Sequence, residues 1–204
     1  MSTKLFSIPF LLIIAGSLLL SCQKEIDGLA GVINPADLKP KVGTVWTYRY
    51  YTYYLNGQLA TTRTLTYKAK NEEIIGGEKW LNIVDVATDT TVYLLNEKIG
   101  GLYRYANSNA YLFCKAPAFI NDTYTSFNEA NTQDFIVKGV NDTLPTGVGD
   151  VPANYYEGYI GIYLVGKIWY NKNAWVVRKV HYRKFAIGPL YYKYSELFID
   201  SIIY

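Results

Sequence analysis

Histidine and cysteine are scarce in this chain of 204 residues, which has one histidine and two cysteines. A single histidine, His181, excludes metal sites built from several histidines and the zinc-protease motif. A Ser-His-Asp triad would need a nucleophile turn, but the sequence has no Gly-x-Ser-x-Gly elbow, and a histidine in a strand is more often structural. We therefore expect no metal site and no cofactor.

Recognisable acidic motifs are also missing. The segment Asn121–Asp134 is rich in Asn and Asp but lacks the spaced acids and central glycine of a calcium loop, so we predict an ordinary long loop. Carboxylate-pair hydrolysis needs only two acids, so a hydrolase stays open as an alternative function. The acids considered for it lie in no motif: Asp85, Asp134, Asp150 and Glu157.

Neither sign of charge is in large excess, since 20 basic and 17 acidic side chains give a net charge of +3. This balance predicts no nucleic-acid partner. Four basic residues surround His181, but strand periodicity splits them between two faces, which favours a solvated strand over a basic patch. They are Arg178, Lys179, Arg183 and Lys184.

An apolar segment follows Lys4 and runs from Leu5 to Leu20. It is shorter than the ~20 residues that a membrane-spanning helix needs. The basic start, the apolar run and the small residue before Cys22 have the layout of a secretory signal, so we predict that residues 1–21 are removed.

The end of this segment resembles the lipobox of bacterial lipoproteins, with Leu19, Ser21 and Cys22 at the matching positions. The resemblance implies that the Cys22 thiol is alkylated by a diacylglycerol and that Cys22 becomes an acylated amino terminus. Several acyl chains give a stable anchor where one does not. Gln23-Lys24-Glu25 resembles the surface-export signal of Bacteroidota lipoproteins. The alternative is an ordinary signal peptide with a chance cysteine.

This resemblance predicts a lipid-anchored protein of the outer membrane, exposed at the cell surface, with the periplasmic face as the alternative. A lipidated Cys22 leaves Cys114 without a disulfide partner, so Cys114 is expected to be a buried, inert thiol. Residues 22–39 have no sustained periodicity and are expected to form a tether. Residues 40–204 are expected to form a single domain.

The rest of the chain has the pattern of β-strands. Val45–Leu55 is rich in Trp, Tyr and Thr, and Asn56-Gly57 is a strong hairpin signal before a returning strand at Gln58–Lys70. Asn71–Gly77 and Asn96–Gly101 look alike and predict two more hairpin tips. Further strands are predicted at 80–87, 91–95, 102–106, 111–114, 135–140, 155–165, 167–170, 175–185 and 190–204. The predicted fold is all-β, an antiparallel and strongly curved meander or barrel-like sheet.

A half-barrel with one short helix, around Asn34–Leu38, is the alternative. The domain also resembles poorly characterised, β-rich envelope lipoproteins of bacteria, on a Gly-x-x-Trp-x-Tyr start and two later motifs. Where that pattern has glycines, this chain has Asn154, at which a turn is expected, and Trp175. The resemblance implies a β-rich fold and does not supply an activity. It rests on Leu38, Gly43, Trp46, Tyr48, Val151-Pro152-Ala153, Trp169-Tyr170 and Val176-Val177-Arg178.

Tyrosine is the compositional outlier, with 21 residues. Neighbours on a strand point to opposite faces, so paired tyrosines place rings on both faces of a sheet. One interpretation is an aromatic platform for a glycan, lipid or protein ligand; the other is that tyrosines simply cover strand surfaces. On the first strand, one face is predicted to carry Trp46, Tyr48, Tyr50 and Tyr54, and the other Tyr51 and Tyr53.

We therefore expect a non-enzymatic binding or interaction module. A periplasm-facing carrier of lipid or lipoprotein, or an envelope-assembly factor, is the alternative, and a carboxylate-based hydrolase is the second alternative. Three tripeptides resemble the acceptor of Bacteroidota O-glycosylation, at Thr90, Thr143 and Ser201.

Overall fold

The computed structural model describes residues 39–128, 131–185 and 190–204. This part of the chain is all-β, as predicted, and contains no helix. No helix in it is long and apolar enough to cross a membrane. The predicted signal segment, the predicted lipidation site and the short helix expected around Asn34–Leu38 lie outside the described residues.

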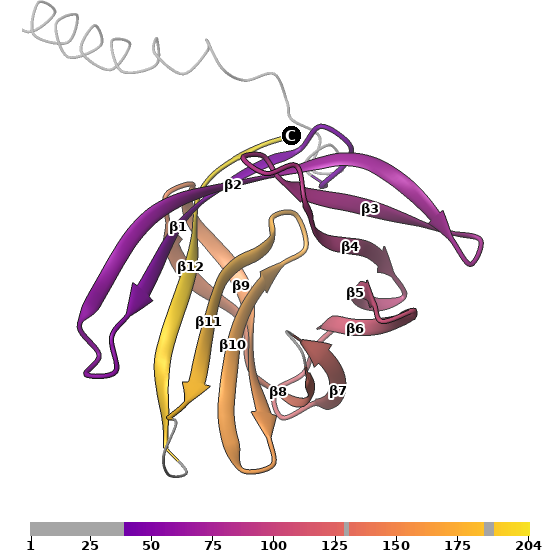
Figure 1. Cartoon of the computed structure of the whole chain (residues 1–204). Coiled ribbons are helices and arrows are strands. Elements are labelled where there is room, and N and C mark those ends of the chain that lie inside the picture. Colours follow the sequence, from indigo (N-terminus) through magenta and orange to yellow (C-terminus); the bar gives the residue numbers. More distant parts are fainter. Residues whose placement is uncertain (1–38, 129–130, 186–189) are drawn as a thin grey trace, which may run out of the picture. The chain divides into compact units, whose positions relative to one another are not determined.

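Twelve antiparallel strands form one sheet (Figure 1). The strands are β1 (Val45–Tyr53), β2 (Leu59–Ile75), β3 (Glu78–Asp85), β4 (Thr91–Lys98), β5 (Gly100–Ala106), β6 (Asn109–Ala116), β7 (Thr123–Asn128), β8 (Asn131–Thr146), β9 (Gly149–Ile160), β10 (Tyr163–Asn171), β11 (Trp175–Lys184) and β12 (Tyr191–Ile203).

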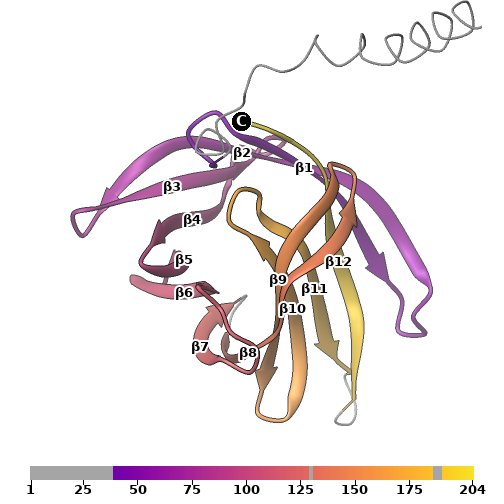
Figure 2. The same ribbon diagram turned by 180° about the vertical axis from the view of Figure 1, so that it is seen from behind.

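The sheet is a meander that joins its own ends. Consecutive strands are hydrogen-bonded throughout except between β6 and β7, and the first strand, β1, pairs with the last, β12. The first and last strands therefore lie in the middle of the sheet, while β6 and β7 are its two edges. The sheet curves until these edges face each other, which gives a nearly closed, barrel-like form with one seam (Figures 1 and 2). Every strand ladder lies between Val45 and Ile203.

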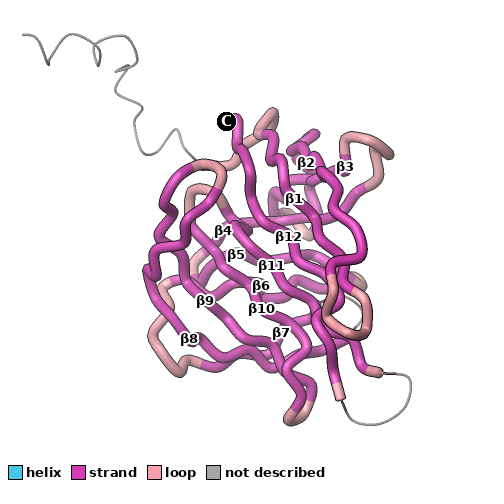
Figure 3. The backbone as a smooth tube through the Cα atoms, turned by 90° about the vertical axis from the view of Figure 1, so that its left-hand side faces the viewer, coloured by secondary structure: helices cyan, strands magenta, loops and turns pink. Residues whose placement is uncertain are grey.

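The core lies on the inner face of the curved sheet. Figure 3 shows the backbone of this sheet from one side. Along β1 the alternation is simple: Trp46 and Tyr48 are buried, whereas Arg49 is exposed. Trp46 Nε1 donates a hydrogen bond to the carbonyl of Ala174 at 3.0 Å, and Tyr48 Oη donates to that of Val176 at 2.9 Å. These bonds join β1 to the start of β11, across the intervening β12.

In the related motif a glycine occupies the position of Trp175. The backbone conformation at this position explains why the motif prefers glycine. The φ of Trp175 is 63°, in the left-handed region that bulky residues rarely adopt. Trp175 is buried and stacks on Trp46, with ring centroids 5.8 Å apart. Burial and stacking offset the backbone strain. The turn expected at Asn154 is wrong, because Asn154 lies within β9, where its side-chain oxygen accepts a hydrogen bond from the Asn141 N–H at 3.1 Å.

Two other sequence predictions are also corrected. Asn121–Asp134 is not a long loop: it contains β7 and the start of β8, because Thr123 to Phe127 alternate in a strand pattern that the flanking Asn and Asp obscure. The segment predicted as one strand at 155–165 is two strands, which turn at Gly161 with φ 59°. The two predicted Gly-Gly hairpin tips are confirmed, between β2 and β3 and between β4 and β5.

Tyrosine hydroxyls bridge the seam between β6 and β7. Tyr124 Oη on β7 donates to the carbonyl of Phe113 on β6 at 3.0 Å, and Tyr156 Oη on β9 donates to that of Lys115 at 2.6 Å. Tyr111 and Phe127 pack across the same seam, with centroids 5.3 Å apart. Side chains thus replace part of the ladder that these two edge strands lack.

We predict that Tyr124→Phe lowers the free energy of unfolding by about 1–3 kcal/mol, because the carbonyl of the buried Phe113 loses its donor. Urea unfolding measures the change. Tyr54→Phe is the matched control, since Tyr54 is exposed and should change the stability little. Equal stability of the two variants would show that the seam does not depend on this bond.

Candidate functional site

The structure separates the residues of the predicted aromatic platform. Trp46 and Tyr48, which are 2% and 4% exposed, belong to the core and have no free ring face. Tyr50 lies further along the inner side of β1 and lines a cavity. Tyr54 follows β1 beyond a register shift and is exposed at the hairpin tip. The predicted face is therefore divided among core, cavity and tip.

Tyr51 and Tyr53 are half-buried on β1. Tyr53 Oη donates to Glu196 Oε2 at 3.1 Å and accepts from Lys193 Nζ at 3.0 Å. Arg178 Nε donates to the other Glu196 oxygen at 2.5 Å and its guanidinium lies over the Trp169 ring. Tyr53 therefore belongs to a network in which Glu196, Lys193 and Arg178 already have hydrogen-bond partners.

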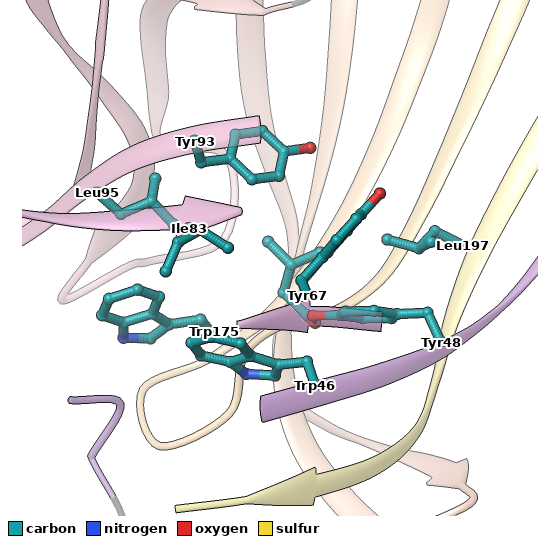
Figure 4. Close-up of a pocket in the computed structure, with 9 residues that line it drawn as sticks. Trp46, Tyr48, Tyr67, Ile83, Tyr93, Leu95, Trp175 and Leu197 are labelled. Atoms are coloured by element: carbon teal, nitrogen blue, oxygen red, sulfur yellow. Dashed lines mark hydrogen bonds between the residues drawn. The ribbon is translucent and has the colours of Figure 1, made fainter. Parts of the chain in front are cut away.

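A small apolar cavity adjoins the core (Figure 4). Its volume is about 20 Å³, which is room for a single water molecule. Figure 4 shows the rings of Trp46 and Trp175 beside each other at one end of it. Its walls are Trp46, Tyr48, Tyr67, Ile83, Tyr93, Leu95, Trp175, Val176 and Leu197. This part of the interior is packed rather than hollow.

A much larger polar cavity continues from it along the inner face, with a volume of about 290 Å³. Five strands supply its lining, namely β1, β2, β4, β11 and β12. The register places Tyr50, Leu197 and Lys179 opposite one another on three neighbouring strands, so strand alternation turns all three inward. The lining residues are Tyr50, Tyr67, Tyr93, Lys179, His181, Arg183, Tyr194, Ser195 and Leu197.

Basic groups in the polar cavity lie against aromatic rings. The Arg183 guanidinium carbon is 3.4 Å from the centroid of Tyr194. Arg63 is not part of the lining, but its guanidinium carbon lies 4.8 Å from the centroid of Tyr50, which is part of it. Lys179 Nζ lies 3.5 Å from the hydroxyl of Tyr93. Ring faces hold these cations in place, and a guanidinium that lies over a ring can still donate hydrogen bonds from its edge. The wall therefore offers donors, hydroxyls and flat apolar surface together.

A second polar cavity, of about 440 Å³, shares two residues with the first, His181 and Arg183. It lies on the side of β8 to β10 and is lined in addition by polar groups such as Gln133 and Lys184. Arg183 and Lys184 are exposed, so this pair of cavities meets solvent at the ends of β11 and β12. Together they form one polar region, which we call the inner polar site.

The acids proposed for hydrolysis do not converge. Asp85 accepts the N–H of Ala87 in a turn, Asp134 accepts the Thr125 hydroxyl, and Asp150 pairs with Pro145 in a ladder. A different cavity, of about 200 Å³, contains two carboxylates, Glu72 and Glu97. Each is ion-paired with lysine, Glu72 with Lys79 at 2.8 Å and Glu97 with Lys39 at 3.4 Å. The described residues contain no cluster of metal-ligating side chains.

Glu157 forms a second network that resembles the one around Glu196. Tyr159 Oη donates to it at 2.6 Å, Tyr155 also donates to it, and Lys167 Nζ lies 3.3 Å away. Burial alone would raise the pKa of Glu157, but these three partners outweigh burial and hold it below its usual value. The hydrogen bond to Glu157 raises the pKa of Tyr159 to about 12. Glu157 is therefore an ionised structural carboxylate.

The remaining predicted residues are placed as follows. Cys114 is fully buried, as predicted, and burial raises the pKa of its thiol. Thr90 and Thr143 are exposed, and Ser201 is half-buried on β12. Cys22 and Gln23-Lys24-Glu25 lie outside the described residues.

Sequence reasoning missed most of the inner polar site. Tyr67, Tyr93, Tyr194 and Ser195 come from three strands, and only the register brings them together. Strand periodicity predicts that Arg183 belongs to a group of basic residues divided between the two faces of the strand. The structure has this division, because Lys179 and Arg183 line the inner cavity while Arg178 joins the Glu196 network.

The Glu196 network predicts a pH dependence of stability. Burial would raise the pKa of Glu196, but the hydrogen bond from Lys193 and the charge of Arg178 outweigh it and hold the pKa below its usual value. A carboxylate whose pKa is lower in the folded than in the unfolded state stabilises the fold at pH values above its pKa in the unfolded state. This stabilisation is lost as the pH falls through the pKa of the carboxylate in the folded state. The stability gap between wild type and Glu196→Gln should therefore shrink below about pH 4.

Urea unfolding of both proteins between neutral and acid pH measures this gap, and Glu157→Gln should behave in the same way. A gap that stays constant over the whole pH range would contradict the assignment.

The chain matches no protein-family model, no curated protein and no solved structure. The roles of its residues therefore rest on the contacts, burial and charge of this chain.

Proposed function

We propose that this chain is a lipid-anchored, non-enzymatic binding module of the outer membrane, exposed at the cell surface, and that the inner polar site holds its ligand. The observation that carries the proposal is the 290 Å³ cavity, in which basic groups and tyrosine rings share one wall. Ring faces and placed polar groups are the usual elements of a small-ligand site. The lipobox-like residues Leu19, Ser21 and Cys22 support the anchor.

An acidic oligosaccharide fits this lining best. Tyr50 and Tyr194 offer ring surface for a sugar face, and Arg183 offers charged donors for a carboxylate. Hydroxyls of Tyr93 and Ser195 add neutral partners for sugar hydroxyls. The aromatic recognition expected from the tyrosine excess is thus retained, although the rings that carry it differ from most of those on the first strand.

The alternatives have weaker support. A carrier of acyl chains needs a large apolar cavity, and the apolar cavity beside the core has room for about one water molecule. A hydrolase needs a proton donor and a base that face one cleft without fixed partners. The two carboxylates that do share a cavity, Glu72 and Glu97, are each held by lysine.

Isothermal titration calorimetry with oligogalacturonate tests the ligand class, with neutral galacto-oligosaccharide for comparison. The acidic sugar should bind a chain that starts at Gln23, which retains every described residue. Arg183→Ala and Tyr194→Ala should each weaken binding about tenfold, the loss of roughly 1.4 kcal/mol. Arg49→Ala is the matched control, because Arg49 is exposed and pairs with Asp200 on the outer side.

Binding of the neutral sugar alone, or an equal loss in Arg49→Ala, would contradict the proposed site. A blank titration with both sugars would remove acidic saccharides as the ligand class.

The anchor is tested by intact-mass analysis of the membrane fraction. Wild type should carry the mass of a diacylglycerol and an added acyl chain, and Cys22→Ser should lack both and leave the membrane, since the thiol is the attachment point. Cys114→Ser is the control and should keep the lipid, because Cys114 is buried in the core. Acylation that persists in Cys22→Ser would disprove the anchor, and protease treatment of whole cells distinguishes the two membrane faces.

A further inference from the structure

The meander places its turns at two ends of the sheet. Turns that follow odd-numbered strands lie at one end, and turns that follow even-numbered strands lie at the other, together with the start of β1 and the finish of β12 (Figure 1). Three neighbouring hairpins, β1–β2, β11–β12 and β9–β10, therefore turn at the end opposite to the start of β1 and the finish of β12. Tyr163 and Tyr191 stack with centroids 5.2 Å apart and join two of these hairpins.

Large apolar side chains are exposed at all three tips. Ile162 is 85% exposed, Leu190 68% and Leu55 60%. Single exposed apolar residues are ordinary, but here they occupy adjacent tips at one end of one sheet. We call the set the apolar tips; it comprises Tyr54, Leu55, Leu59, Ile160, Ile162, Tyr163 and Leu190.

The segments that form the apolar tips carry only basic charged side chains, and the carboxylates next to them on these strands, Glu157 and Glu196, are ion-paired with Lys167 and Lys193. Residues 52–63, 159–164, 182–185 and 190–193 contain no acidic side chain. They contain four basic ones, of which Arg63, Arg183 and Lys184 are exposed, while the fourth, Lys193, pairs with Glu196. The β2–β3 hairpin at the other end has an exposed aliphatic residue as well, Ile74, but Glu72, Glu73 and Glu78 lie beside it in the sequence. Among the hairpin tips that the structure describes, the apolar tips combine several exposed aliphatic side chains with basic residues and no acidic residue in the same segments.

We propose that the apolar tips dock on a lipid bilayer that carries anionic headgroups. Aliphatic side chains enter the boundary between headgroups and acyl chains, tyrosines lie at headgroup level, and the basic residues contact lipid phosphates. A bilayer with anionic headgroups matches both features at once, because its surface is negatively charged and its boundary with the acyl chains accepts apolar side chains. The mouth of the inner polar site, at Arg183 and Lys184, then lies beside the membrane surface.

The tether permits this orientation in the membrane that would hold the anchor. The described chain starts at Lys39, near the opposite end of the sheet, and β12 has 13 residues. A strand of that length spans about 43 Å, whereas residues 22–38 reach about 55 Å when extended. One bilayer can therefore hold both the lipid at Cys22 and the apolar tips.

Vesicle flotation of the chain that starts at Gln23 tests the docking without the lipid anchor and without a sugar ligand. Vesicles that contain phosphatidylglycerol should bind the wild type, and vesicles of phosphatidylcholine alone should bind it more weakly. The triple variant Leu55→Ser, Ile162→Ser, Leu190→Ser should bind at least about tenfold more weakly, because three apolar insertions are lost.

The triple variant Val42→Ser, Ile74→Ser, Ile99→Ser is the matched control. These residues are at least half exposed at the other end, so vesicle binding should stay unchanged. Circular dichroism and urea unfolding confirm that both variants are folded. An equal loss in both variants, or a wild type that floats with neither vesicle, would overturn the docking and would leave the sugar titration unaffected.

Discussion

The pairing of the first strand with the last is the constraint on which the rest of the structure depends. Without the ladder between β1 and β12, the chain would be two separate six-stranded meanders, each with an open edge in the middle of the present sheet. Trp46 and Tyr48 reinforce the junction, because each donates a hydrogen bond past β12 to the chain at the start of β11. The strained backbone of Trp175 is tolerated there since its ring completes the same contact.

This constraint also accounts for the seam. A sheet that begins and ends in its middle must leave its edges at the centre of the sequence, and here they are β6 and β7. Edge strands carry unpaired backbone groups that invite other strands. Tyr124 and Tyr156 donate to carbonyls of β6, so part of the tyrosine excess serves the sheet itself rather than a ligand.

The fold class was predictable because its determinants are local: β-branched and aromatic residues in alternation, separated by Asn-Gly and Gly-Gly turns. Long-range pairing was not, since nothing near Val45 identifies Ile203 as its partner. The first strand shows the consequence. Alternation correctly placed Trp46, Tyr48 and Tyr50 on one face, but it gave no means of knowing that two of them are covered by Trp175 and Tyr67. Most of the inner polar site was hidden for the same reason.

The two ends of the sheet differ in a way that follows from the topology. The end at which β1 starts and β12 finishes carries acids and lysines in ion pairs, such as Glu72 with Lys79. The other end carries the mouth of the inner polar site and the apolar tips, with basic residues between them. Neither sheet curvature nor core packing requires this asymmetry, because hairpin tips contribute little to either. Water does not stabilise a surface that combines exposed aliphatic side chains with basic residues. A partner that binds apolar and basic groups together is therefore the better explanation of this surface.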